Sequence, residues 1–290
     1  MPAVPVQVLP ASHPGSSPAR GNAAAPGSGR LVAQPLPGGT LEGVDVDALE
    51  GRLHSWELVT ALDGPGTRLV TWVTGCALRC LYCHNPDTWN VNDGTRTTVG
   101  EHVTRLKRYT GFLRAAHGGI TISGGEPLLQ PAFTAGFLRR AKELGLHTAL
   151  DTSGFYGRRA SDELLDDVDL VLLDIKSSDP ETYQKVTGRR LAPTVEFAER
   201  LAGRGNRMWV RFVLVPGYTD DPANVDGVAR IAASLGDVVE RVEVLPYHSM
   251  GTYKYERLGI AYPLEGVPAP TGEAAERVRD VFRARGLTTY

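Results

Sequence analysis

Residues 170–174 read LVLLD, a short apolar run that ends in an aspartate. A strand that is apolar at every position, rather than at alternate positions, is typical of a parallel sheet buried on both faces. Similar runs recur along the chain and alternate with stretches in which apolar residues have helical spacing. We expect further strands at 69–74, 120–123, 147–150, 209–215 and 242–245, and helices at about 103–113, 133–144, 194–201, 224–235 and 273–285.

This alternation predicts an α/β fold in which helical crossovers connect the strands of a parallel sheet. About six strand–helix units fit between residue 52 and residue 290, fewer than the eight of a closed barrel. We therefore expect a partial (β/α)6 barrel with outer helices over residues 52–290. Functional residues in such folds lie at the carboxyl ends of the strands.

The first 51 residues differ in composition from the rest of the chain. Residues 1–40 hold 8 of the 20 prolines, contain no Asp or Glu, and are rich in Gly, Ala and Ser. Such a segment buries too little apolar surface to offset the entropy lost on ordering. We expect a disordered tail there and an acidic linker at 41–51. The segment does not resemble a secretory signal, and an organellar transit peptide is the less favoured alternative.

Charge and cysteine content exclude several classes of protein. Lys and Arg total 31 against 33 Asp and Glu, a net charge of −2, which excludes binding of nucleic acid mainly through a positive field. No run approaches the roughly 18 apolar residues of a membrane helix. Three cysteines argue against a disulfide framework and for a reducing compartment, the cytoplasm. We expect a monomer without nucleic-acid or membrane partners.

Cys76, Cys80 and Cys83 lie within eight residues, directly after the strand expected at 69–74. The spacing C-x3-C-x2-C lets three thiolates of one loop converge on one metal centre, and thiolates suit zinc or iron–sulfur chemistry. The chain has no fourth cysteine. A four-iron cluster held by three cysteines would leave one iron free to bind substrate. The alternative is a structural zinc site with His84 as the fourth ligand, although an adjacent Cys and His rarely both reach one zinc.

The cysteine spacing, with Tyr82 before the last cysteine, resembles the signature of the radical S-adenosylmethionine (SAM) superfamily. Over residues 52–290 the chain is similar, more narrowly, to the group that activates pyruvate formate-lyase. The motifs that carry this similarity are DGPG at 63–66, GCALRCLYCHN at 75–85, SGGE at 123–126, DTSG at 151–154, DIK at 174–176, VPG at 215–217 and LPYH at 245–248.

The resemblance implies a radical-SAM, TIM-like partial barrel and a reaction. Cys76, Cys80 and Cys83 would ligate a [4Fe–4S] cluster whose open iron binds SAM. An electron from reduced flavodoxin or ferredoxin would then cleave SAM. The resulting 5′-deoxyadenosyl radical would remove a hydrogen atom from a backbone glycine of pyruvate formate-lyase (formate C-acetyltransferase), leaving a glycyl radical on that partner.

The resemblance also implies further site residues. Contacts with SAM are expected from Tyr82, Cys83, His84, Gly124, Gly125, Glu126, Asp174, Ile175, Lys176, Arg211 and His248. Asp151, Thr152 and Asp174 match positions that hold a monovalent cation, K+ or Na+, and Asp63 is expected to hold the incoming glycine loop. Taken without the resemblance, each Asp could cap a helix or turn, the glycines could form an ordinary turn, and His248 could be structural.

Two other functions stay open. The chain has no cysteine between Cys83 and Gly124, where larger activating enzymes carry additional cysteine clusters, so the pyruvate formate-lyase branch is favoured. The first alternative keeps the chemistry and acts on a different glycyl radical enzyme or a small molecule. The second is a non-catalytic iron–sulfur or zinc-binding protein.

Overall fold

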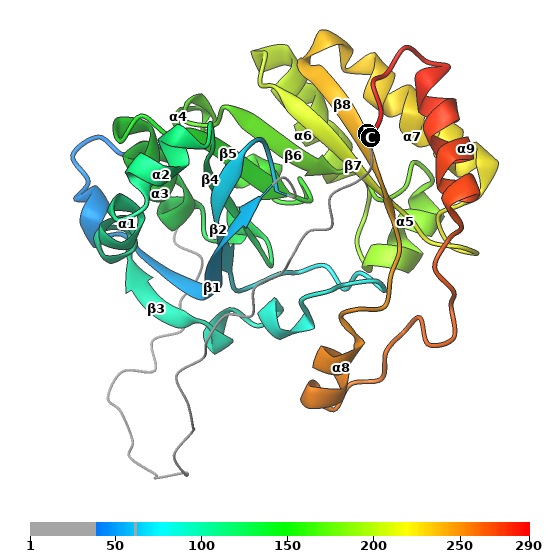
Figure 1. Ribbon diagram of the computed structural model, residues 1–290, viewed down its shortest axis with the longest axis horizontal. Coiled ribbons are helices and arrows are strands. Elements are labelled where there is room, and N and C mark those ends of the chain that lie inside the picture. The colour runs from blue at the N-terminus through cyan, green and yellow to red at the C-terminus, as the bar shows by residue number, and fades with distance from the viewer. Residues whose placement is uncertain (1–38, 61–62) are drawn as a thin grey trace. The chain divides into compact units, whose positions relative to one another are not determined.

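The fold is built on one open sheet of eight strands, in the order β3-β1-β2-β4-β5-β6-β7-β8 (Figure 1). The structure is a computed structural model that describes residues 39–60 and 63–290, all within one unit. The strands are β1 (Glu50–Thr60), β2 (Thr67–Val73), β3 (Thr95–Thr98), β4 (Gly119–Gly124), β5 (His147–Thr152), β6 (Leu170–Asp174), β7 (Met208–Leu214) and β8 (Val239–Pro246).

Six of these strands, β2 and β4 to β8, run parallel and confirm the predicted α/β partial barrel. The strand β6 covers the residues predicted for it, and Val171, Leu172 and Leu173 have no exposed surface. The other two strands, β1 and β3, are antiparallel and were not predicted. They extend the sheet at one edge, and β8 forms the other edge, so the sheet does not close.

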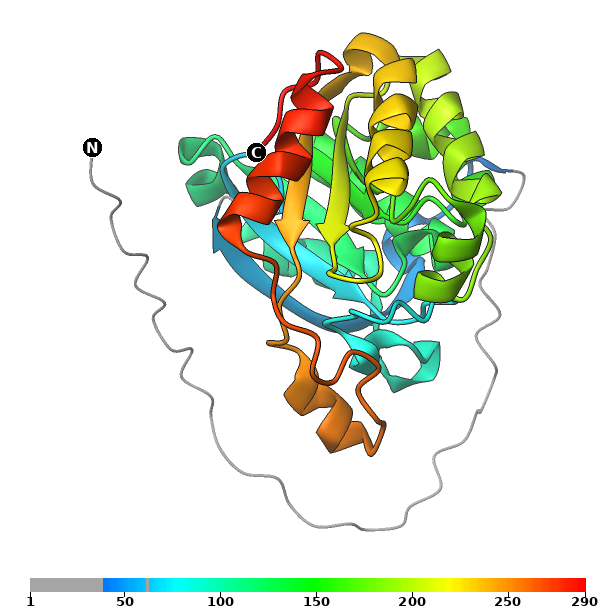
Figure 2. The same ribbon diagram turned by 90° about the vertical axis from the view of Figure 1, so that its right-hand side faces the viewer.

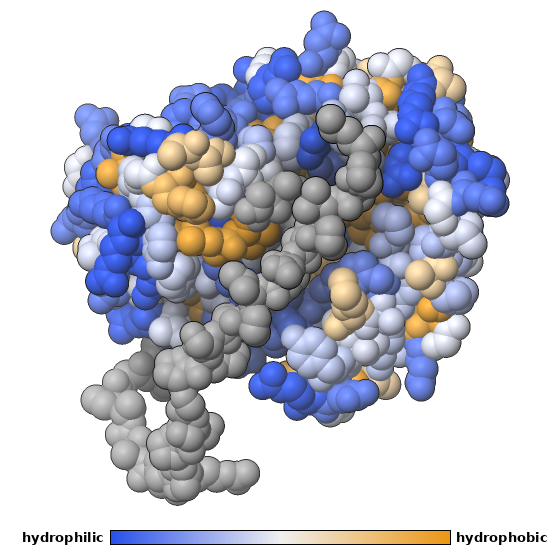
Figure 3. All heavy atoms as spheres, viewed as in Figure 1, coloured by the Kyte–Doolittle hydropathy of each residue, from blue (hydrophilic) through white to orange (hydrophobic). Residues whose placement is uncertain are grey.

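Helices cover the sheet in the described part of the chain. They are α1 (Val99–Lys107), α2 (Thr110–Ala115), α3 (Pro131–Glu143), α4 (Asp162–Asp166), α5 (Pro180–Thr187), α6 (Ala192–Arg204), α7 (Pro222–Ser234), α8 (Thr252–Leu258) and α9 (Gly272–Arg283). Figure 2 shows α7 and α9 lying against the strands β7 and β8. The α9 helix buries Ala275, Val278 and Phe282, and the face that it presents in Figure 3 is hydrophilic. The α9 helix is therefore amphipathic and packs its apolar side on a sheet whose own strands are apolar.

The helix expected at 103–113 is two helices. The amides of Arg108 and Tyr109 donate to the carbonyls of Arg105 and Leu106, three residues back instead of four, at 3.2 and 2.9 Å. This tighter turn ends α1 before α2 begins. It brings the Tyr109 ring to 5.8 Å from that of Trp56 on β1.

The segment 41–51 is not the linker that its acidic composition predicted. Leu41 and Val46 are buried among the core residues, and the Leu41 amide donates to Glu163 at 2.7 Å. The segment's last two residues, Glu50 and Gly51, already belong to β1. The acidic side chains that suggested a linker point outward, as Asp47 does in its 2.9 Å ion pair with Arg140.

The tail predicted at 1–40 lies outside the described residues, apart from its last two positions. Among the residues that the structure does describe, the helices are all too short or too polar to cross a membrane.

Candidate functional site

The three cysteines lie on one loop, residues 75–85, which follows β2 and which we call the Cys loop. Its backbone is tied to the end of α5, because the amides of Arg79 and Leu81 donate to the carbonyls of Thr187 and Val186 at 2.8 and 2.9 Å. At the far end of the loop, the Tyr255 hydroxyl of α8 donates to the Cys83 carbonyl at 3.1 Å. The shape of the loop is therefore fixed by contacts with two helices that are distant in sequence.

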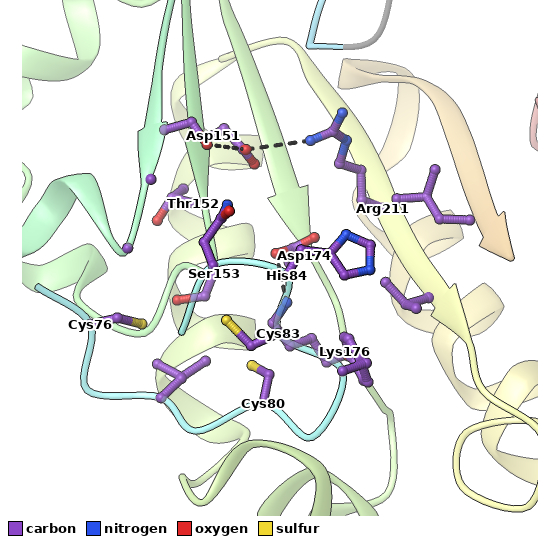
Figure 4. A pocket seen from close by; sticks show the side chains of 18 of the residues that line it. Cys76, Cys80, Cys83, His84, Asp151, Thr152, Ser153, Asp174, Lys176 and Arg211 are labelled. Atoms are coloured by element: carbon purple, nitrogen blue, oxygen red, sulfur yellow. Dashed lines mark hydrogen bonds and ion pairs between the residues drawn. The ribbon is translucent and has the colours of Figure 1, made fainter. Parts of the chain in front are cut away.

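The Cys loop borders a cavity of about 550 Å³ at the carboxyl ends of the parallel strands. All three thiols are free and line this cavity, and Figure 4 shows Cys76 facing Cys80 and Cys83 across it. Burial raises the pKa of the Cys80 thiol to about 12, although the nearby Lys176 charge opposes the shift. Burial and the neighbouring Cys80 likewise raise the pKa of Cys76. Thiolates at these positions thus need a positively charged centre among them.

Two glycines let the end of β4 lie directly against the Cys loop. A Cβ on Gly125 would stand 2.4 Å from the Gly75 carbonyl oxygen, and Gly124 has a φ of +120° with the β2 backbone 2.3 Å from its Cβ position. Both glycines line the cavity. Close backbone approach therefore requires glycine here, whatever ligand the cavity holds.

Two of the residues expected to contact SAM do not line the cavity. Ile175 and Glu126 are both buried and are not among the residues that line the cavity. Glu126 accepts hydrogen bonds from the Thr152 hydroxyl at 2.6 Å and from the Ser153 amide at 3.0 Å. Its carboxylate thus positions the end of β5. The other expected residues all line the cavity: Asp63, Cys76, Cys80, Tyr82, Cys83, His84, Gly124, Gly125, Asp151, Thr152, Asp174, Lys176, Arg211 and His248.

Arg211 on β7 is surrounded by three carboxylates. Its Nε donates to Glu243 at 2.9 Å, and its two terminal nitrogens lie 3.4 Å from Asp151 and 3.6 Å from Asp63 (Figure 4 draws the Asp151 contact). Burial raises the pKa of Asp63 and of Asp151, and the Arg211 charge opposes both shifts. The guanidinium thus joins the loop at residue 63 to β5, β7 and β8.

Lys176 and Asp174, two residues apart at the end of β6, form a second charged pair. The Lys176 ammonium donates to Asp174 at 2.7 Å and lies 5.6 Å from the centre of the Tyr82 ring. The Asp174 charge, against the opposing effect of burial, leaves the pKa of Lys176 well above its usual value. The cavity therefore presents a fixed ammonium next to the Cys loop.

Two polar atoms in the cavity wall find no hydrogen-bond partner among the described residues. They are the Tyr82 hydroxyl and Nδ1 of His248, both buried. The His248 ring lies 4.2 Å from that of His84, whose Nε2 is 3.2 Å from the His248 carbonyl. Buried polar groups without partners are rare in native proteins. These two atoms are therefore available to a polar ligand of the cavity, and the Cys loop supplies three thiols, the donor type that iron–sulfur clusters use.

Several lining residues were given no role of their own by the sequence, although they lie inside quoted motifs or expected strands: Trp72, Ser123, Ser153, Val213 and Tyr247. Ser123 donates to Asp151 at 2.7 Å, so it orients a predicted residue. Most of these positions lie near the end of a strand or follow one, and together with the motifs this is the signal that could have indicated them.

Comparisons with known proteins identify the family of the chain. The model of the Radical SAM superfamily matches residues 70–225. The chain is 41% identical over 238 residues to the pyruvate formate-lyase 1-activating enzyme of Escherichia coli K12, covering 81% of this chain and 96% of that protein. It is 44% identical over 235 residues to the pyruvate formate-lyase-activating enzyme of Staphylococcus aureus USA300, with coverages of 79% and 93%.

Solved structures give the same fold. A domain of the pyruvate-formate lyase-activating enzyme from Bacteroides vulgatus superposes with a TM-score of 0.51 at 27% identity, covering 60% of this chain and 98% of that domain. A radical SAM methyltransferase from Sphaerobacter thermophilus superposes with a TM-score of 0.57 at 18% identity, with coverages of 83% and 76%. This second likeness concerns the fold alone.

Proposed function

Since this chain belongs to the radical SAM superfamily and, within it, to the pyruvate formate-lyase-activating enzymes, we propose that it installs the glycyl radical of a pyruvate formate-lyase. The observation that carries the proposal is the Cys loop, which presents three free thiols to one cavity at the carboxyl ends of the parallel strands.

In this proposal Cys76, Cys80 and Cys83 hold a [4Fe–4S] cluster, and SAM occupies the adjoining cavity. When bound, the cluster supplies the electron that cleaves SAM, and the radical so formed takes a hydrogen atom from a backbone glycine of the partner. The protein holds the cluster and SAM in the correct relative position and excludes water from both.

The charged side chains of the cavity suit a ligand that carries both an amino group and a carboxylate. Asp174 is available to the amino group, while Lys176 and Arg211 are available to the carboxylate. A carboxylate at Arg211 would share the guanidinium with Asp151 and Asp63, whose contacts of 3.4 and 3.6 Å are longer than a hydrogen bond. The unpartnered atoms of Tyr82 and His248 would bind the nucleoside.

A monovalent cation, K+ or Na+, is proposed beside the SAM carboxylate at Asp151, Thr152 and Asp174. The support for it is the close spacing of negative charge, since Asp174 and Asp63 both add to the upward pKa shift of Asp151. Asp63 is proposed to hold the partner's glycine loop. Its own carbonyl accepts from the Thr121 hydroxyl at 2.5 Å, which anchors this end of the loop at the cavity rim.

The remaining parts of the proposal follow from the reaction. A glycyl radical enzyme docks over the cavity, and reduced flavodoxin or ferredoxin supplies the electron. We expect the protein to be a monomer. We also expect it to work in the reducing cytoplasm, because a cluster with an open iron is labile in oxygen.

The test begins with anaerobic reconstitution, which should give about four irons and four sulfides per chain. Reduced protein with SAM should release 5′-deoxyadenosine and methionine, and addition of pyruvate formate-lyase should give the glycyl-radical doublet in electron paramagnetic resonance. Cys80→Ser should abolish both the cluster and the cleavage. The matched control is Ala77→Ser, which places a serine on the same loop at a position without a thiol and should keep both.

Each failure has a distinct meaning. One zinc per chain and no sulfide would refute the radical chemistry and favour a zinc-binding protein. Turnover retained in Cys80→Ser would refute the ligand assignment. Competent SAM cleavage without a doublet would favour a different glycyl radical enzyme as the target.

A further inference from the structure

The outer side of the Cys loop carries a cluster of four exposed basic side chains. Arg79 belongs to the loop itself, Lys185 lies in the last turn of α5, and Arg189 and Arg190 follow that helix. We call these four residues the basic patch. Figure 1 shows the Cys loop, in cyan, running alongside the end of α5.

The basic patch lies directly on the backbone that carries the cysteines. Arg79 donates to the carbonyls of Cys76 and Leu78 at 2.7 and 2.8 Å, and Arg189 donates to the carbonyl of Ala77 at 2.9 Å. The Cβ position of Gly188, between Lys185 and Arg189, is 3.9 Å from Cβ of Arg79. Arg79 and Arg189 therefore lie on the backbone that carries the thiols, and Lys185 and Arg190 lie within four residues of Arg189 along the chain.

No acidic side chain of the described residues lies within 4.0 Å of the charged atoms of these four bases. Elsewhere the exposed arginines are commonly paired, as Arg158 is with Glu196 at 2.8 Å and Arg204 with Asp166. Between residues 180 and 190 the only acidic residue is Glu181. Like charges held together repel one another, and a negatively charged partner would relieve that repulsion.

We propose that the basic patch is the docking surface for an acidic one-electron donor protein. The proposal rests on the proposed function, because only a redox cluster on the Cys loop needs such a donor. The donor is oxidised by one electron and the cluster is reduced by one. SAM and the partner's glycine occupy the cavity on the inner side of the loop, so an electron can enter from the outer side while both are bound.

Binding is the first test, with oxidised flavodoxin as the probe and reconstituted, unreduced protein. Lys185→Glu/Arg190→Glu reverses the charge of two residues. Within the described structure, neither side chain makes a hydrogen bond to the Cys loop. The matched control is Lys107→Glu/Arg108→Glu, the same change on exposed residues at the end of α1, a helix that contacts the edge strand β3. We expect the patch variant to raise the dissociation constant about tenfold or more at low salt, and the control to leave it within about twofold. The difference should shrink as salt rises.

Turnover is the second test and separates this proposal from the one on which it rests. With dithionite as reductant, the patch variant should release 5′-deoxyadenosine at the rate of the unaltered protein. With reduced flavodoxin, its rate at low donor concentration should fall about tenfold or more. Failure of the unaltered protein to cleave SAM with dithionite would refute the proposed function.

Normal dithionite turnover combined with equal flavodoxin binding by the two double variants would overturn the docking surface alone. Failure of flavodoxin to bind the unaltered protein would overturn it as well. So would equally tight binding of a DNA duplex, which would show a general attraction for polyanions.

Discussion

Replacing Arg211 by methionine tests whether its guanidinium holds the cavity together. The change removes the positive charge from Asp63, Asp151 and Glu243 and keeps most of the side-chain volume. Removing one partner of a buried ion pair costs about 3 to 5 kcal/mol, because the other charge stays buried without compensation. Only the Glu243 contact has hydrogen-bond length, at 2.9 Å, and the two Asp contacts are longer. We therefore expect a loss near the lower end, about 3 kcal/mol at pH 7.

The loss should depend on pH with a defined sign. Burial already raises the pKa of Asp63 and Asp151, so the folded protein binds their protons more tightly than the unfolded chain does. Stability from these two groups is thus greatest below the unfolded pKa of about 3.9, and it is lost as the pH rises through the folded values. Without Arg211 the folded pKa values rise further. The difference between variant and parent should therefore shrink as the pH falls toward 4.

Equilibrium unfolding in urea, followed by circular dichroism on reconstituted protein under anaerobic conditions, measures both effects. Arg158→Met is the matched control, because Arg158 is 87% exposed and its pair with Glu196 should contribute less than about 1 kcal/mol. Arg211→Lys keeps a charge and should fall between the two, which also provides a folded variant if Arg211→Met is too unstable. Equal stabilities of Arg211→Met and Arg158→Met at pH 7 would show that the carboxylates do not depend on Arg211.

Three further changes have defined outcomes. Gly125→Ala should displace the Cys loop and lower the iron content after reconstitution, because its Cβ would meet the Gly75 carbonyl oxygen at 2.4 Å. The control Gly203→Ala, in open space on α6, should leave the iron content unchanged and raise the free energy of unfolding by up to about 1 kcal/mol. Tyr82→Phe should weaken SAM binding about threefold to tenfold in equilibrium dialysis. It should not lower the melting temperature, because the hydroxyl has no partner among the described residues. Unchanged affinity would show that SAM does not contact this hydroxyl. Burial lowers the pKa of His102 to about 3, so its neutral form is favoured in the folded state and stability is lost as the pH falls below 6.5. Between pH 6.5 and 5, the free energy of unfolding of His102→Asn should fall by about 2 kcal/mol less than that of the parent, measured by urea unfolding at both pH values. Equal decreases in the two proteins would contradict this.

Most strands of the parallel sheet could be predicted from the sequence, because they are apolar on both faces. LVLLD at 170–174 became β6 without a change of bounds. The antiparallel strand β1 was missed, because residues 50–60 contain many polar side chains and lack the continuous apolar run of the buried parallel strands. The buried position of Leu41 could not be predicted from the sequence either. The residue that accepts the hydrogen bond of its amide, Glu163, lies 122 residues away.

For the site, most of the residues that the resemblance named line one cavity, while the contacts of each came from the structure alone. Trp72 lies outside every quoted motif and Ser123 was given no role within its motif, yet both line the cavity. Glu126 sits within a motif, yet it is buried and its carboxylate is bonded to Thr152 and Ser153. The three-carboxylate environment of Arg211 joins four separate segments of chain, and no local pattern encodes it.

The hydrogen bonds that tie Arg79 and Leu81 to the end of α5 bear on how the protein recovers from damage. These bonds join backbone to backbone and involve no thiol, so oxidative loss of a bound cluster would leave them intact. A zinc finger, by contrast, unfolds when its metal leaves. We expect the emptied protein to keep its loop in place and to accept new iron and sulfide without refolding, so that a protein inactivated by air can be repaired rather than replaced.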